Sequence, residues 1–471
     1  MVELLQLLDD VLKKKINISD FLDALVVDAL KSGASDIHIE SKEDDILLVR
    51  YRVDGVLRDI ISIGPELKDT LLFIIKVRAK LRTDVHLAPQ DGKIPFVVKK
   101  ADIDGDKEKI KKEEENDKDQ EKDDVEEPIE EKEKKKKEKE EEEQEKKVLN
   151  RLEAFKAEEK DTYNVDARVS ILPVSYGEKV VIRLLTQANR SHSLADLGFE
   201  EHDLAELEKA YTQPYGLILI TGPTGSGKTT TLYSILKILN TREVNITTIE
   251  DPVEYSIEGV NHIQINVKSD LTFATGLRSI LRQDPNVIMV GEIRDTETAR
   301  ITVNSALTGH LVLSTLHAND SVSAVPRLID MGIEPFLIAS TLNIVVAQRL
   351  ARKLCPDCKK PCSLEKDKEI KEMLKIRPDV AKYIKPTDKF YKAVGCDKCN
   401  NVGLKGRIGI YEVLVINKTM RDTIIKNPTM DDIFQTAKKS GFKLMVEDAV
   451  DKLKKGYIDI PELLKVIAIK D

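Results

Sequence analysis

The first hundred residues carry two hydrophobic periods, one helical and one extended. From Phe21 to Gly33 apolar residues recur every three or four positions, which predicts an amphipathic helix. The stretches SDIHIE and ILLVRYRVDGVL then alternate apolar and polar residues around a turn at Asp54-Gly55, which predicts two half-buried strands. A helix followed by such strands predicts a small α/β domain.

Strand-like alternation continues on both sides of a charged interruption. Before it, LRTDVHLAPQDGKIPFVVKK predicts the end of a helix, a turn and a strand. After it, residues 162–186 predict two more strands around the turn SYG. We therefore assign residues 19–188 to one small α/β domain and residues 1–18 to an N-terminal helical extension.

Beyond residue 189 the pattern changes to short apolar runs. GLILIT, ITTIE, VIMV and GHLVLSTL are rich in aliphatic or β-branched residues, and turn or helix signals follow them. Such runs are typical of buried strands in a parallel sheet. We predict that residues 189–352 form an α/β core around this sheet.

A phosphate-binding motif follows the first of these runs. GPTGSGKT fits Gly-x-x-x-x-Gly-Lys-Thr between a strand and a predicted helix at 230–239. Lys228 would reach the β- and γ-phosphates, and Thr229 would bind Mg²⁺. The alternative is a glycine-rich turn that binds nothing. We predict a P-loop, RecA-like ATPase core whose ATP-binding residues are Gly222, Pro223, Thr224, Gly225, Ser226, Gly227, Lys228, Thr229 and Thr230.

Two later strands end in carboxylates at the edge of the sheet where open α/β folds bind ligands. Glu250 lies just before Asp251-Pro252 and suits the orientation of an attacking water, although it could also be an acidic turn that ends a strand. Glu292 follows VIMVG at a position where P-loop enzymes usually carry an aspartate, so we place it on the magnesium side.

Two histidines bracket the last apolar run. His310 precedes LVLSTL and His317 follows it. A lone histidine in such a place is more often a packed residue than a catalytic one. Beside a phosphate loop, we interpret these histidines as sensors of the nucleotide and count His317 among the catalytic residues.

The order of the phosphate loop, IEDPVEY, LRQDPNVIMVGEIRD and GHLVLSTLHAND resembles the secretion ATPase superfamily. The chain is most similar to its type II secretion and type IV pilus assembly branch, from about Phe21 onward. In that family these stretches are the Walker A motif, Asp box, Walker B motif and His box, and their functional residues are carried onto Glu250, Glu292 and His317. Longer members have another N-terminal docking domain, for which this chain has only about twenty residues.

The resemblance implies a specific activity and place of action. It implies an ATP-hydrolysing homohexamer that powers assembly of a type IV pilus or a type II secretion pseudopilus through an inner-membrane platform protein. The protein would then be cytoplasmic and peripheral at the inner face of the plasma membrane, and would contact the membrane only through partners. The N-terminal residues carry no secretory signal or membrane span, which agrees with this expectation.

A ring would let arginines of the small domain act on ATP bound by a neighbouring copy. The candidates are Arg50, Arg52, Arg168 and Arg183, of which we assign Arg168 and Arg183 as catalytic. The alternative is that these arginines only pair with nearby acids on the sheet surface. Three more arginines lie near the Walker B stretch and could link the site to its neighbours: Arg278, Arg282 and Arg294.

All five cysteines lie beyond residue 350. Two Cys-x-x-Cys pairs, Cys355/Cys358 and Cys396/Cys399, predict a closed tetrahedral Zn²⁺ site in a module at 353–402. The alternative to zinc is a redox role or no metal at all. Cys362 is a spare that could replace one ligand or simply pack. Residues 363–390 are interpreted as a charged helical protrusion held at its base by the metal, and residues 403–471 as a mostly helical C-terminal part. Pilus retraction ATPases of the superfamily generally lack such a module.

Most of the net negative charge of the chain lies in one segment. Residues 106–147 hold 21 acidic and 14 basic side chains, whereas the rest of the chain holds 62 and 61. We predict a disordered charged insertion at about 102–160, although a partner-binding tail remains an alternative. The near-neutral remainder gives no basic field for nucleic acid, which disfavours a helicase-type translocase.

Two alternatives to the assembly motor remain. A retraction or DNA-uptake ATPase would use the same site for a different output. A nucleotide-binding scaffold would hold ATP without turnover, and the presence of Lys228, Glu250 and Glu292 argues against it.

Overall fold

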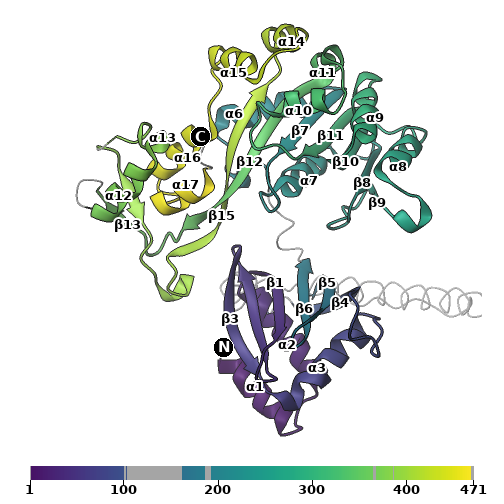
Figure 1. Ribbon diagram of the computed structural model, residues 1–471, viewed down its shortest axis with the longest axis vertical. Helices are drawn as coiled ribbons and strands as arrows, with labels where there is room; N and C mark the ends of the chain where they lie inside the picture. Colours follow the sequence, from purple (N-terminus) through teal and green to yellow (C-terminus); the bar gives the residue numbers. More distant parts are fainter. Residues whose placement is uncertain are drawn as a thin grey trace, which may run out of the picture. The chain divides into compact units, whose positions relative to one another are not determined.

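In a computed structural model the chain divides into two compact units, Met1–Arg190 and Ser191–Asp471 (Figure 1). The residues that the structure describes are 2–99, 102, 162–185, 193–363, 367–385 and 387–467. The charged insertion predicted at 102–160 lies outside the described residues except for Asp102. No helix of the described ranges is long and apolar enough to cross a membrane.

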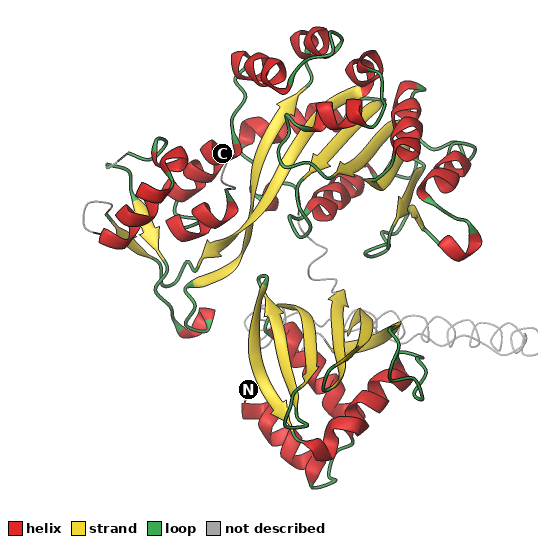
Figure 2. Ribbon diagram, in the orientation of Figure 1, coloured by secondary structure: helices red, strands yellow, loops and turns green. Residues whose placement is uncertain are grey.

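In its described residues, the first unit has an antiparallel six-stranded sheet with helices α1, α2 and α3 on one face (Figure 2). The strand order is β3-β2-β1-β6-β5-β4. The strands are β1 (Ala34–Ser41), β2 (Leu47–Val53), β3 (Val56–Ile63), β4 (Gln90–Lys99), β5 (Thr162–Val174) and β6 (Gly177–Leu185), and the helices are α1 (Val2–Leu12), α2 (Ile18–Lys31) and α3 (Pro65–Arg78).

Helix α2 shows why these residues pack as they do. Its N-cap Asn17 accepts a hydrogen bond from the Asp20 amide at 2.9 Å, which satisfies one of the free N–H groups of the first turn. Phe21 and Leu25 are fully buried against the sheet, and the Tyr51 hydroxyl of β2 donates to the Leu25 carbonyl at 2.9 Å. The helical period in the sequence therefore marks the face that covers the sheet.

The second unit is built on a seven-stranded sheet of order β15-β12-β7-β11-β10-β8-β9 (Figure 1). All neighbouring strands are parallel except β12 and β15. The strands are β7 (Gly216–Thr221), β8 (Ile246–Glu250), β9 (Val260–Gln264), β10 (Val287–Ile293), β11 (Leu311–Leu316), β12 (Leu342–Leu354) and β15 (Leu404–Val415).

Helices cover both faces of this sheet, as the apolar runs predict. On β7, Ile218 and Ile220 pack in the cluster that holds α6 (Glu201–Tyr211) and α7 (Lys228–Leu239). Leu217 and Leu219 face the other cluster. The helices of that second face are α8 (Phe273–Ile280), α9 (Thr296–Leu307), α10 (Ala324–Asp330), α11 (Pro335–Thr341), α14 (Lys418–Ile424) and α15 (Met430–Lys439).

The C-terminal part contributes a strand that the sequence analysis did not separate from the helices. Strand β15 lies antiparallel to β12, with Ile344 opposite Val415 and Leu354 opposite Leu404. Its IGIYEVL run is buried, so it completes the core sheet from outside residues 189–352. After β15 the chain is helical, and its last two helices are α16 (Met445–Lys454) and α17 (Ile460–Val466).

The expected helical protrusion is instead packed against these last helices. Ile370 of α12 (Lys368–Ile376) and Val380 of α13 (Pro378–Ala381) share a buried cluster with Leu453 of α16. A two-stranded sheet of β13 (Lys360–Cys362) and β14 (Phe390–Lys392) closes this part. Apolar burial therefore holds the segment in addition to any metal at its base. Three 3₁₀ turns complete the described elements: η3 (Ala195–Leu197), η4 (Val267–Ser269) and η5 (Asp397–Cys399).

Candidate functional site

The predicted phosphate loop connects β7 to α7 at the carboxyl edge of the sheet. Gly227 is the N-cap of α7 and has φ 89°, a left-handed conformation that glycine adopts without a steric cost. The Lys228 ammonium group folds back over the loop and donates to the carbonyls of Gly222 and Pro223 at 2.9 and 3.0 Å. Burial lowers the pKa of Lys228, and the charge of Glu292 acts in the opposite direction. The loop and the Walker B glutamate therefore share one electrostatic site.

Glu250 lies at the end of β8 and is only 3% exposed. Three side chains hold its carboxylate. The Tyr233 hydroxyl of α7 donates to Oε2 at 2.6 Å, the Thr248 hydroxyl donates to Oε1 at 2.6 Å, and His262 Nδ1 lies 2.9 Å from Oε1. Burial raises the pKa of Tyr233, and the neighbouring Glu250 charge raises it further, so the phenol stays a donor.

The backbone fixes the orientation of the His262 ring. The Ile257 amide donates to His262 Nε2 at 3.1 Å, so Nε2 is an acceptor and the ring proton resides on Nδ1. Nδ1–H therefore donates toward Glu250. The sequence did not predict that His262 or Tyr233 lies beside Glu250. His262 lies on β9, and nothing in its spacing from Glu250 indicates that β8 and β9 are neighbours.

Glu292 is the centre of a second, more exposed cluster. Its Oε2 lies 3.1 Å from His317 Nε2, and its Oε1 pairs with the Arg294 guanidinium. Arg294 also donates to Asp251 Oδ2 at 3.3 Å, and these carboxylates raise the pKa of Arg294. Strands β8, β10 and β11 thus bring Asp251, Glu292 and His317 to one edge of the sheet.

The remaining predicted polar residues lie elsewhere. His310 precedes β11, at the opposite end from His317, and its Nδ1 lies 2.9 Å from the Ser305 carbonyl. Arg278 pairs with Glu297, and Arg282 donates to the Arg278 carbonyl at 2.9 Å. These two arginines therefore make local contacts at the surface.

The arginines of the first unit lie on its sheet. Arg183 Nε donates to Asp36 at 2.9 Å, Arg52 lies 3.6 Å from the same carboxylate, and Arg50 pairs with Glu40. Arg168 of β5 is the cross-strand neighbour of Arg183. Arg50, Arg52 and Arg183 therefore pair with local acids, as the alternative interpretation expected.

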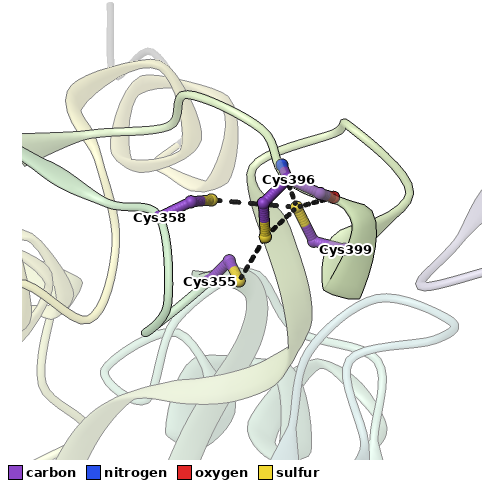
Figure 3. A group of neighbouring side chains, drawn as sticks. All are labelled: Cys355, Cys358, Cys396 and Cys399. Carbon is purple, nitrogen blue, oxygen red and sulfur yellow. Dashed lines mark hydrogen bonds between the residues drawn. The ribbon is translucent and has the colours of Figure 1, made fainter.

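Four cysteines converge from the two Cys-x-x-Cys pairs (Figure 3). Sulfur atoms are 3.9 Å apart for Cys355 and Cys396, 3.8 Å for Cys358 and Cys399, and 3.7 Å for Cys396 and Cys399. Zinc–sulfur bonds of about 2.3 Å in a tetrahedron require sulfurs about 3.8 Å apart. The donor set and its spacing therefore fit Zn²⁺, whereas Cys362 lies on β13 outside this group.

Backbone donors prepare one of these sulfurs to bind a cation. Although burial alone disfavours a thiolate, the amides of Cys396 and Gly403 donate to Cys399 Sγ at 3.2 Å each and lower its pKa to about 6. Burial raises the pKa of Cys396 to about 11, and its hydrogen bond to Cys399 adds to the rise. A thiolate at Cys399 is the ligand form that zinc requires.

A P-loop, acidic strand ends and a histidine at the carboxyl edge of a parallel sheet define a nucleotide-hydrolysing P-loop enzyme. The family model described as "Type II/IV secretion system protein" matches residues 11–105 and 150–465. The chain belongs to this family of type II/IV secretion system proteins and is an ATPase. The match leaves out residues 106–149, which contain the charged segment.

Individual relatives agree with this assignment. The type II secretion system ATPase E of Vibrio cholerae is 39% identical over 445 residues, which are 94% of this chain and 74% of the relative. The type IV pilus assembly ATPase PilB of Myxococcus xanthus is 38% identical over 443 residues, 94% of this chain and 66% of the relative. The resemblance to secretion and pilus assembly ATPases is therefore confirmed.

A solved structure supports the fold. The ATPase DotB of Legionella pneumophila superposes with a TM-score of 0.58 at 19% identity and 94% coverage of both chains. At this identity the likeness concerns the fold alone. The predicted fold class, a small α/β domain with a P-loop ATPase domain and a four-cysteine cluster, is thus confirmed.

Proposed function

We propose that this ATPase is a homohexameric motor that powers assembly of a type IV pilus or a type II secretion pseudopilus. It would act at the inner face of the plasma membrane through an inner-membrane platform protein, without binding nucleic acid. The observation that carries the proposal is the convergence of Lys228, Glu250, Glu292 and His317 at one edge of the seven-stranded sheet. The names of the similar curated proteins support secretion or pilus assembly over retraction.

Each residue of the site has a role that follows from its surroundings. Lys228 and the loop amides would bind the phosphates of ATP. A carboxylate has about four acceptor positions, and Glu250 uses three of them for Tyr233, Thr248 and His262. The remaining position on Oε2 would orient the attacking water. His317 and Arg294 would hold Glu292 in place.

Metal ions would be held by residues already described. Thr229 and Glu292 would bind Mg²⁺, which neutralises phosphate charge when bound. Cys355, Cys358, Cys396 and Cys399 would bind Zn²⁺, and four thiolates leave no open position for catalysis. The zinc is therefore assigned a structural role.

The proposal predicts a specific loss in Glu250→Gln. The glutamine amide lacks the negative charge with which the Glu250 carboxylate would orient the attacking water. Turnover of ATP should therefore fall by about 100-fold or more, whereas ATP binding should persist. Steady-state phosphate release and equilibrium binding of ATP would be measured on the same preparations, with mass photometry for the oligomeric state.

Glu297→Gln is the matched control, because this glutamate lies on the surface of α9 and pairs with Arg278. The control should keep wild-type turnover. Wild type that binds ATP without any turnover, even with a reconstituted platform protein, would favour the scaffold alternative. Wild-type turnover in Glu250→Gln would instead overturn only the role of Glu250.

A further inference from the structure

Gln348 of β12 lies directly beneath the phosphate loop. Strand β12 is parallel to β7, with Ala347 opposite Thr221, so the next residue of β12 meets the beginning of the loop. Gln348 is 2% exposed and is far from the loop in the chain. It has no part in the roles assigned above.

The two ends of the Gln348 amide bind two different parts of the loop region. Its Nε2 donates to the Ser226 carbonyl at 2.8 Å, and its Oε1 accepts a hydrogen bond from the Thr231 hydroxyl at 2.8 Å. Thr231 lies in the first turn of α7 and is completely buried. One side chain therefore joins the loop to the helix that follows it.

The loop is also shaped to fit against this residue. A Cβ atom at Gly222 would lie 2.4 Å from the Gln348 carbonyl oxygen, and one at Gly227 would lie 2.7 Å from Gln348 Nε2. Both distances are too short for real atoms, so the two loop glycines allow the backbone to close on Gln348. The contact at Gly227 is with the side-chain amide of Gln348, and the contact at Gly222 is with the backbone of the same residue.

Holding the Ser226 carbonyl has a consequence on the opposite side of the loop. The peptide between Ser226 and Gly227 is not among the cis bonds of the described backbone. In a trans peptide the C=O and N–H groups point in opposite directions. With the Ser226 carbonyl turned inward to Gln348, the Gly227 N–H points outward, toward the side where a phosphate binds.

We infer that Gln348 is a positioning residue for nucleotide phosphate, acting through the Ser226–Gly227 peptide. It touches no reacting atom. Instead it keeps the Gly227 N–H and the first turn of α7 in the orientation that binds phosphate. The inference rests on the proposed binding of ATP by the loop.

The test replaces the amide with groups of similar size. Gln348→Glu keeps an acceptor for Thr231 but presents a carboxylate oxygen to the Ser226 carbonyl, and Gln348→Met removes both hydrogen bonds without a buried charge. Asn343→Asp is the matched control, because Asn343 lies on the same strand and donates to the Tyr215 carbonyl at 3.1 Å, at the other end of β7.

Both Gln348 variants should bind ADP about ten- to a hundredfold more weakly than wild type, the loss expected when one hydrogen bond to a charged group is misaligned. Asn343→Asp should bind ADP as wild type does. Fluorescent-ADP titration gives the affinities, and thermal unfolding without nucleotide reports the fold. Gln348→Met keeps the test usable if the buried carboxylate of Gln348→Glu prevents folding.

The possible results separate this inference from the proposed function. Wild type that does not bind ADP contradicts the proposed function first. If wild type binds and both Gln348 variants bind equally well, Gln348 has no positioning role. Equal losses of ADP affinity and thermal stability in Asn343→Asp and Gln348→Met would assign a general structural role to the strand and also overturn the inference.

Discussion

Glu40 of β1 shows how a buried carboxylate in the first unit stays ionised. Its carboxylate is 7% exposed and receives Lys42 at 2.9 Å, Lys179 at 3.0 Å and Arg50. Burial alone would favour the neutral acid, but these three cations outweigh it and lower the pKa of Glu40 to about 2. The ionised form is therefore part of the folded sheet.

This pKa predicts how acid acts on the first unit. The pKa of Glu40 in the folded unit lies below its unfolded value of about 4.3. The ionised carboxylate therefore stabilises the folded unit fully above about pH 4.3, and this stabilisation is lost as the pH falls toward 2. Glu40→Gln should lose about 1–3 kcal/mol at pH 7, and its difference from wild type should shrink between about pH 4.5 and 2. Hydrogen exchange of peptides from residues 34–63 would measure this difference.

The exposed Glu43 provides the control for this experiment. Glu43→Gln keeps the same change in formal charge near the end of β1 without removing a buried carboxylate. It should match wild type at every pH. An equal loss in both variants would attribute the effect to net charge rather than to the contacts of Glu40.

At the scale of elements, the four-cysteine cluster ties together segments that leave and re-enter the core sheet. Cys355 follows β12 directly, and Cys399 ends η5 shortly before β15. Between them the chain forms β13, α12, α13 and β14. A metal at this point would close the loop where it leaves the sheet, and the apolar packing on α16 and α17 would hold its far end.

Removal of one cysteine ligand should separate the contribution of the metal from that of the apolar packing. Cys396→Ser should lose stoichiometric zinc, measured by plasma mass spectrometry, and should exchange amide hydrogens faster over residues 353–362 and 393–403. Helix α7 should be unchanged, because it packs in a different core cluster.

Cys362→Ser is the matched control, since Cys362 lies outside the four-cysteine group. It should retain one zinc ion per chain. Loss of zinc from Cys362→Ser, or full zinc in Cys396→Ser, would contradict the assignment of the ligands.

At the scale of the whole molecule, the proposed ring predicts that active sites are shared between copies. Arg168 and Arg183 would then act on ATP bound to the Lys228 of a neighbouring copy. Arg183→Ala and Lys228→Ala should each be inactive alone. A mixture of the two, dissociated and reassembled, should regain part of the wild-type turnover, because some interfaces combine an intact arginine with an intact lysine.

The control mixture combines Lys228→Ala with Glu250→Gln. Both residues belong to the same unit of one copy, so no interface in this mixture contains a complete site. Phosphate release should stay at the level of the separate variants. Equal recovery in both mixtures, or none in the first, would show that Arg183 does not act between copies.

The sequence by itself determined the features that neighbouring residues encode. The phosphate loop and its flanking strand and helix, the buried strands that carry Glu250 and Glu292, and the paired cysteines all depend on short spacings. Local backbone geometry and side-chain periodicity are set within a few residues, which is why a linear pattern can predict them.

Only the tertiary structure decided which distant segments meet. Gln348 reaches Ser226 across 122 residues, and Arg183 reaches Asp36 across 147. His262 meets Glu250 because β9 pairs with β8, and β15 joins the core because it pairs with β12. Such contacts follow from strand order and register, which arise when apolar faces of many elements are buried together, and no local period in the chain specifies them.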